Sequence, residues 1–258
     1  MDYEQLISEA LEAPLAGWDF APLLGRVVED PLPWDYKRLL LSRLPHAASL
    51  LDLGTGGGEF LSGLGPLPPR TAATEGYPPN LPLARRRLEP LGIEVTAVGG
   101  DDVLPFPDNS FALVASRHES YDPSEIRRVL TSDGLFITQQ VGGQNLDEVN
   151  QALGAPPPLA PRDWDLARAG AALAEAGLTV TWSQEAQVRT MFHDVGALVL
   201  FLRIVAWQVP DFDVDRYARR LRVLHEQMER GGVLTAHAHR FILLAAPNDR
   251  MAHHSQVR

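Results

Sequence analysis

The sequence predicts an α/β fold in which a seven-stranded, mostly parallel sheet carries helices on both faces and a helical cap. Two features of the 258 residues lead to this expectation. Apolar runs of strand length alternate with helix-like segments from Ser49 onward, which is typical of a parallel sheet covered by helices. One run, from Leu50 to Leu53, leads into a turn with glycines at positions 54, 56, 57 and 58, as in a buried strand followed by a tight turn and a helix.

Apolar periodicity and turn residues place the individual elements. Asp133 and Gly134 are expected to form the turn into the fifth strand, while Asp163 and Gly177 are expected to begin and end a helix. The expected strands are 49–53, 71–75, 93–98, 111–116, 134–141, 178–188 and 239–246, and the expected helices are 3–12, 35–44, 58–64, 80–90, 123–130, 163–176, 194–207 and 213–230.

Composition excludes several classes of function. The chain has no cysteine, which excludes disulfides, thiolate zinc sites and a cysteine nucleophile. Its net charge of −10 argues against a broad nucleic-acid surface, because phosphate contacts need a basic face. The first residues lack the basic start and apolar core of a signal peptide, and the most apolar segment, Val195 to Leu202, is too short to span a bilayer. We therefore expect a cytoplasmic protein that does not enter a membrane.

The glycine turn indicates which ligand the backbone receives. A dinucleotide pattern, G-x-G-x-x-G, would place its third glycine where Glu59 stands. The turn also offers two carboxylates, Asp52 and Glu59, and no basic residue for a pyrophosphate. Such a turn suits a ligand that carries an ammonium and a sulfonium better than one that carries phosphates. A tight turn with no ligand is the alternative.

The turn resembles motif I of the class I S-adenosylmethionine-dependent methyltransferases, with Asp52, Gly54, Gly56 and Gly58 in the family's places. The resemblance continues for about a hundred residues and implies a Rossmann-like fold with an antiparallel last strand. It also implies S-adenosylmethionine as cofactor. Glu75, at the end of the next strand, stands where the family has an acid that holds both ribose hydroxyls, although alone it could be a solvated loop acid.

Residues 100–111 resemble the family's segment that contacts the adenine. An acid there bonds the adenine amino group, and here the acid is doubled, so Asp101 or Asp102 is the contact, with the spacing favouring Asp101. Both could instead only cap a turn. The resemblance thus implies the cofactor-binding set Asp52, Gly54, Thr55, Gly56, Gly58, Glu75, Gly76, Asp101, Asp102, Ser116 and Arg117.

The segment from Ser116 to Asp122 stands where the family places residues that face the transferred methyl group. Methyl transfer needs a base only if the acceptor must lose a proton, and His118 or Glu119 could serve as catalytic residues. The alternatives are a loop histidine bonded to the backbone and, for Glu119, a salt bridge with Arg117 or Arg127. The aromatic side chains Trp18, Trp34, Tyr36, Phe192 and Trp207 either wall a substrate pocket or pack in a cap.

No metal site is expected. His237 and His239 would share one face of a strand, but no acid or third histidine stands at a matching place, and His193 lies apart in the sequence.

The expected organisation is an N-terminal helical cap segment at residues 1–45, followed by an S-adenosylmethionine-binding domain at 46–258 with a helical insertion at about 190–235. Ligands bind at the carboxyl ends of the strands in open α/β sheets, so both additions are expected there as a mobile lid. A rigid dimer interface is the alternative, and monomer and homodimer stay open.

The sequence as a whole predicts a methyltransferase for a small-molecule acceptor. A methyltransferase for RNA or protein is disfavoured by the charge and by the lack of a basic or zinc-binding module. A non-catalytic S-adenosylmethionine-binding protein is the alternative from another class, since function lies in the site and not in the fold. The acceptor atom, oxygen, nitrogen or carbon, is left open.

Overall fold

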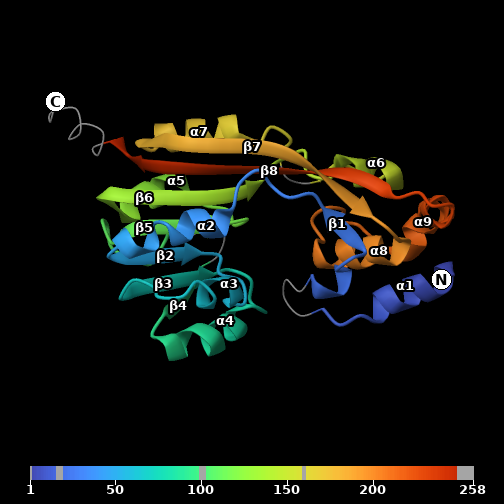
Figure 1. Cartoon of the computed structure of the whole chain (residues 1–258), viewed down its shortest axis with the longest axis horizontal. Coiled ribbons are helices and arrows are strands. Elements are labelled where there is room, and N and C mark those ends of the chain that lie inside the picture. Colours follow the sequence, from blue (N-terminus) through green and yellow to red (C-terminus); the bar gives the residue numbers. More distant parts are fainter. Residues whose placement is uncertain (1, 16–19, 99–102, 159–160, 249–258) are drawn as a thin grey trace. The chain divides into compact units, whose positions relative to one another are not determined.

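The computed structural model describes residues 2–15, 20–98, 103–158 and 161–248 (Figure 1). Its strands form one sheet in the order β1-β7-β8-β6-β5-β2-β3-β4. The predicted α/β class and the mostly parallel sheet are confirmed. The described part of the chain has eight strands rather than the seven expected, because a short N-terminal strand joins the edge.

The parallel half of the sheet contains five strands and the helices between them. Strand β2 pairs in parallel with β3 and β5, β3 pairs with β4, and β5 pairs with β6. Every residue of β2 is buried, as expected of a central strand covered on both faces. The elements are β2 (Ser49–Leu53), β3 (Arg70–Glu75), β4 (Glu94–Ala97), β5 (Phe111–Arg117), β6 (Leu130–Val141), α2 (Tyr36–Leu41), α3 (Glu59–Ser62), α4 (Leu81–Leu88), α5 (Pro123–Val129) and α7 (Leu166–Glu175), with 3₁₀ turns η2 (Leu44–His46) and η3 (Glu89–Leu91).

The other half of the sheet is built from β7 (Leu178–Phe192), β8 (Leu234–Pro247) and β1 (Val27–Glu29). Asn248 N donates to Gly177 O, while the Thr181 hydroxyl donates to Leu244 O. These pairs advance along β7 as they retreat along β8, so the two strands are antiparallel, as predicted for the last strand. The unexpected β1 pairs antiparallel with β7, Val27 opposite Phe192.

Two local expectations were wrong, and one helix was not expected. The helix expected from Asp163 begins at Leu166, and its cap is Asp165, whose carboxylate accepts from Arg168 N at 2.8 Å. Asp133 and Gly134 do not form a turn, because β6 starts at Leu130 and passes through them with a register shift against β5. Helix α6 (Asp147–Leu153) was not expected; it starts after Leu146, whose backbone is left-handed at φ 53°.

The chain divides into two compact units, which we call the sheet unit and the helical unit. The sheet unit comprises residues 34–140, 165–185 and 241–248, and its apolar core includes Leu50, Leu113 and Ile137. It holds all of the parallel strands except the last residue of β6. Strands β7 and β8 contribute residues to both units.

The helical unit comprises the described residues of 1–33, 141–164 and 186–240. Asp2, Asp194 and Asp213 cap the starts of α1 (Tyr3–Glu12), α8 (Val195–Ile204) and α9 (Val214–Glu229), because their carboxylates accept backbone N–H bonds, whereas α6 has no side-chain cap. Helix α8 is apolar on nearly all sides and is correspondingly buried. The helices are α1 (Tyr3–Glu12), α6, α8 (Val195–Ile204) and α9 (Val214–Glu229), with a 3₁₀ turn η1 (Ala21–Leu23). Among the described residues no helix has the length and apolar character needed to cross a membrane.

Candidate functional site

The turn between β2 and α3 leaves its backbone bare. Gly54, Gly56 and Gly58 all have positive φ, at 64°, 64° and 81°, a conformation that glycine adopts without steric cost. A Cβ on Gly54 would lie 2.5 Å from Cγ of Glu119, and one on Gly58 would lie 2.8 Å from Cγ of Leu88. The glycine at 58 therefore serves helix packing, while the glycine at 54 faces the loop that follows β5.

Asp52 lies at the carboxyl end of β2 with only 5 % of its surface exposed. Burial and, to a smaller extent, the Glu75 carboxylate raise the pKa of this carboxyl, whereas Thr55 and Arg117 lower it. The net result is a pKa of about 6. The Thr55 hydroxyl is close enough to act on Asp52, but its geometry does not make a regular hydrogen bond.

Glu75 ends the neighbouring strand β3 and is 4 % exposed, so it is a buried acid and not a solvated one. Its carboxylate accepts from Tyr77 N at 2.7 Å. Burial raises its pKa, whereas hydrogen bonds from the backbone of Tyr77, Gly56 and Gly76 lower it. Two buried acids thus flank the glycine turn, one at the end of each adjacent strand.

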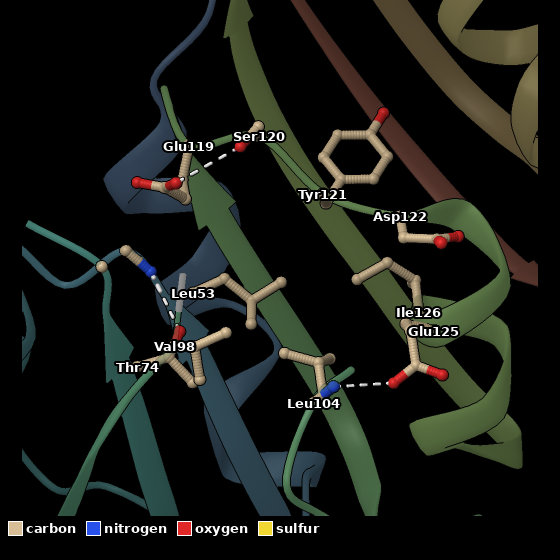
Figure 2. Close-up of a pocket in the computed structure, with 12 residues that line it drawn as sticks. Leu53, Thr74, Val98, Leu104, Glu119, Ser120, Tyr121, Asp122, Glu125 and Ile126 are labelled. Carbon is tan, nitrogen blue, oxygen red and sulfur yellow. Dashed lines mark hydrogen bonds between the residues drawn. The ribbon is translucent and has the colours of Figure 1, made fainter. Parts of the chain in front are cut away.

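A hollow opens beside the turn, lined by Gly54, Thr74 and Gly76 and by residues that follow β4 and β5 (Figure 2). Glu119 and Ser120 lie at one end of the hollow, while Leu104 lies at the other, where its backbone N–H donates to Glu125 at 2.8 Å. Apolar side chains including Leu53, Val98 and Ile126 complete the wall. Asp101 and Asp102, the expected adenine contacts, lie outside the described residues.

The loop after β5 is held by amide side chains from β6. Ser116 is fully buried, and the Gln140 amide donates to the carbonyl of Glu119 at 2.9 Å. The Glu119 side chain covers Gly54, and burial raises its pKa. Ser120 donates weakly to this carboxylate at 3.4 Å.

His118 takes a left-handed backbone, φ 64°, and its N–H donates to Gln139 O at 2.8 Å. The Trp34 indole N–H donates to Gln139 Oε1 at 2.8 Å, and Gln139 Nε2 lies 2.9 Å from His118 Nε2. Because the indole can only donate, the amide must direct its NH₂ group to the histidine, so His118 Nε2 accepts a hydrogen bond and carries no proton.

Arg117 lies with its guanidinium carbon 4.3 Å from the centre of the Phe60 ring, a cation–π contact. Tyr36 also packs against Phe60, with 5.6 Å between the two ring centres. The sequence offered Trp34 and Tyr36 only among several aromatic residues and did not single out Phe60 or Gln139. The pair of amides at the end of an apolar strand, Gln139 and Gln140, was a signal that could have been used.

The remaining candidates lie elsewhere. Phe192 is buried in the helical unit against Phe201, at 5.2 Å between ring centres, so it packs as a core residue. Trp207 is half-exposed in the same unit, and Trp18 lies outside the described residues. His237 lies 2.7 Å from Glu148, an acid the sequence did not reveal. Within the described ranges, no three side chains of metal-binding type are grouped to hold an ion.

Comparison with known families finds one match that covers this site. Residues 51–138, which include the glycine turn, both buried acids and the loop after β5, match a family described as "Methyltransferase domain". This part of the chain is therefore similar to a methyltransferase domain. S-adenosylmethionine is the methyl donor of the class I methyltransferases, which the glycine turn also resembles. A comparison with curated proteins found no match.

Solved structures of similar fold agree with the architecture. YcgJ from Bacillus subtilis has 17 % identity and a TM-score of 0.58, over 81 % of this chain and 97 % of that one. A Bacillus halodurans protein proposed to be a methyltransferase has 18 % identity and a TM-score of 0.55, over 80 % and 97 %. The [4+2]-cyclase SpnF has 16 % identity and a TM-score of 0.50, over 82 % and 79 %. At these identities the likeness concerns the fold alone.

The site of the methyltransferase domain fits S-adenosylmethionine chemically. The bare turn at Gly54 and Gly56 allows close approach, and the carboxylates of Asp52 and Glu75 suit an ammonium and a pair of hydroxyls. The buried hydroxyl groups of Tyr36 and Thr55 make no regular hydrogen bond within the protein, so both could bond to a ligand.

Proposed function

We propose that this protein transfers a methyl group from S-adenosylmethionine to a small-molecule acceptor. The observation that carries the proposal is the pair of buried acids, Asp52 and Glu75, on either side of the bare Gly54–Gly56 turn. Asp52 would hold the cationic amino-acid end, and Glu75 the ribose hydroxyls. Leu104, at the end of the hollow opposite Glu119, and Val98, in its wall beside Thr74, would contact the adenine (Figure 2).

The cofactor supplies a methyl group on a sulfonium, which leaves as a neutral thioether when an acceptor attacks in line. The protein's own task is therefore to align the acceptor and to exclude water. Glu119 is the group we assign to proton removal, where the acceptor requires it. Its side chain lies over Gly54. Its pKa is raised by burial, so this carboxylate is a stronger base than an exposed one.

His118 is the less suitable base, although the sequence offered both residues. Its Nε2 is engaged by Gln139, whose amide orientation is set by Trp34. Taking up a proton at Nε2 would require the Gln139 amide to turn and to lose the indole bond. We therefore assign His118 to positioning of the loop, with Ser116 and Arg117 beside it.

The small-molecule class is supported by charge. The chain carries a net charge of −10, which disfavours the long phosphate contacts of an RNA substrate. We further propose that residues 1–45 and 190–235 close over the bound substrate as a lid, since these segments lie outside the alternating core in the sequence.

The decisive experiment combines binding and transfer. Calorimetry should show S-adenosylhomocysteine binding far more tightly than NAD, and transfer of labelled methyl groups should follow with a panel of small acceptors. Glu119→Gln should lower the transfer rate at least tenfold while leaving cofactor affinity within about twofold, an estimate for loss of one general base. Glu94→Gln, at an exposed position on β4, is the matched control. NAD binding as tight as that of the thioether would overturn the proposal.

A further inference from the structure

Arg117 ends strand β5 at the edge of the sheet where the glycine turn begins. Strands β5 and β2 are paired with Leu53 opposite Ser116, so Gly54 and Arg117 both come directly after this pair. Ligands of open α/β sheets bind outside the carboxyl ends of the strands. The Arg117 side chain is exposed, and it is therefore accessible to a ligand at this edge.

The guanidinium of Arg117 is held against an aromatic ring. Its central carbon lies 4.3 Å from the centre of the Phe60 ring, and Phe60 packs in turn against Tyr36, with 5.6 Å between the ring centres. Phe60 is also partly buried against the core of the sheet unit. The contact restrains the guanidinium, while the N–H groups at its edges stay available for hydrogen bonds.

An acid close in the sequence does not pair with this arginine. Glu119 has its side chain over Gly54, and its carboxylate accepts a bond from the Ser120 hydroxyl at 3.4 Å. Within the part of the chain that the structure describes, no hydrogen bond or ion pair joins the Arg117 guanidinium to another residue. Its five N–H donors are thus free for a ligand.

The hollow proposed for the cofactor does not include Arg117 in its wall. Successive residues of a strand point to opposite faces, so Ser116 and Arg117 diverge. The Ser116 hydroxyl donates to the Glu119 carbonyl at 3.2 Å, and Glu119 lies at one end of the hollow (Figure 2). Arg117 points instead toward Phe60 on helix α3. A ligand bonded to Arg117 therefore lies outside the hollow, beside the loop that carries the proposed base.

We propose that Arg117 binds a carboxylate of the methyl acceptor, so that the substrates are small carboxylic acids. The planar fork of a guanidinium matches the two oxygens of a carboxylate. A phosphate would bring a second negative charge to a site that already holds Asp52, Glu75 and Glu119. Oxygens bonded to Arg117 are weak nucleophiles, so the methyl group goes to another atom of the same molecule. The inference rests on the proposed function, because it names the substrate class of that reaction.

The test is a ligand-observed NMR titration of protein saturated with S-adenosylhomocysteine. The probes are acetate, benzoate and indole-3-acetate, each matched with its neutral amide, and phenyl phosphate. At least one carboxylate should bind about tenfold or more tightly than its amide, and Arg117→Gln should remove this difference, as expected for loss of hydrogen bonds between charged groups. Phe60→Leu should weaken carboxylate binding by about two- to fivefold, the range for an exposed cation–π contact.

Arg70→Gln is the matched control. Arg70 is also exposed and also lies against a phenylalanine, 5.3 Å from the centre of the Phe111 ring. It starts β3, however, and therefore lies at the opposite end of the parallel strands. This variant should leave the affinity of every probe within about twofold of wild type, as expected for a distant, independent site. Equal losses in Arg70→Gln and Arg117→Gln would show that carboxylates bind exposed arginines without selection, and would overturn the proposal.

The cofactor also carries a carboxylate, and calorimetry distinguishes this source from the acceptor. S-adenosylhomocysteine has the carboxylate, whereas its decarboxylated analogue lacks it. Arg117→Gln should change both affinities by the same factor, because Arg117 is assigned to the acceptor. A loss confined to S-adenosylhomocysteine would place the cofactor's own carboxylate on Arg117 and overturn the proposal.

The outcomes separate this inference from the proposed function. If the wild type binds S-adenosylhomocysteine but none of the three carboxylates reaches the tenfold preference over its amide, the substrate class is wrong and the proposed function stands. Unchanged carboxylate affinity in Arg117→Gln would also overturn the inference, as would tighter binding of phenyl phosphate than of benzoate. Failure of the wild type to bind S-adenosylhomocysteine would overturn the proposed function and, with it, this inference.

Discussion

Replacing Asp52 by asparagine is expected to stabilise the protein without cofactor while abolishing tight cofactor binding. The carboxyl is buried at the end of a central strand, and burial raises its pKa from the ordinary 3.8 to about 6. Above that pH the side chain is charged in a buried position, where Thr55 and Arg117 offset only part of the cost of desolvation. Asparagine has nearly the same shape and carries no charge, so it removes this cost.

The magnitude follows from the pKa. Each pKa unit corresponds to about 1.4 kcal/mol, so the rise to about 6 corresponds to about 3 kcal/mol of folding free energy. Because the folded-state pKa is raised, Asp52 favours folding fully below pH 3.8, and this contribution is lost as the pH rises through about 6. Asparagine also buries an amide, which offsets part of the gain. We therefore expect Asp52→Asn to raise the free energy of unfolding by about 1–3 kcal/mol at pH 8 and by less at pH 5.

The assay is urea unfolding of wild type and Asp52→Asn at pH 5 and pH 8, without ligand and with S-adenosylhomocysteine. Ligand should stabilise the wild type in proportion to the logarithm of its concentration and should leave the variant nearly unchanged. Glu94→Gln, which removes an exposed carboxylate from the same sheet, should not alter stability at either pH. A variant less stable than wild type at pH 8 without ligand would refute the assignment of a buried, strained charge to this position.

Three further predictions concern the turn, the ribose site and the lid. Gly54→Ala should abolish detectable cofactor binding. Gly25→Ala, also at positive φ but with open space around it, should lower stability by only about 1–2 kcal/mol and leave cofactor affinity unchanged. Equal affinities in the two variants would contradict a ligand at the turn. Glu75→Ala should weaken cofactor binding by about 2–3 kcal/mol in calorimetry, and unchanged affinity would mean that this acid does not hold the ribose. Hydrogen exchange should show residues 190–235 and 1–45 gaining protection when S-adenosylhomocysteine binds, whereas uniform high protection in both states, with a dimer in solution, would identify an interface instead.

Short-range features of the chain were predictable. The apolar run from Leu50 to Leu53 can bury itself only as a central strand, and the glycines that follow are the residues that a turn with positive φ requires. Glu75 could be placed at the end of the next strand because strand length and spacing are local properties. The class of fold and of cofactor follow from these few residues.

Features that depend on distant partners escaped prediction. Strand β1 has three half-buried or exposed residues and no strong pattern of its own, and it exists because Val27 to Glu29 pair with residues 190–192. Asp133 and Gly134 have the composition of a turn, yet they lie inside β6, at the irregularity between the pair Leu130–Phe111 and the pair Leu135–Leu113. In both places the pairing of distant residues, and not the local preference, sets where the strand runs.

The sequence by itself determined the bare turn and the two acids beside it, because backbone conformation at glycine and the order of strands are encoded within a few residues. Only the tertiary structure decided the chemistry of those groups. The pKa of Asp52 depends on its burial. Our proposal of Glu119 rather than His118 as the base depends on a hydrogen bond from Trp34 to Gln139, which are more than one hundred residues apart in the chain. Desolvation and hydrogen bonding act between neighbours in space, and a linear chain does not state which side chains become neighbours.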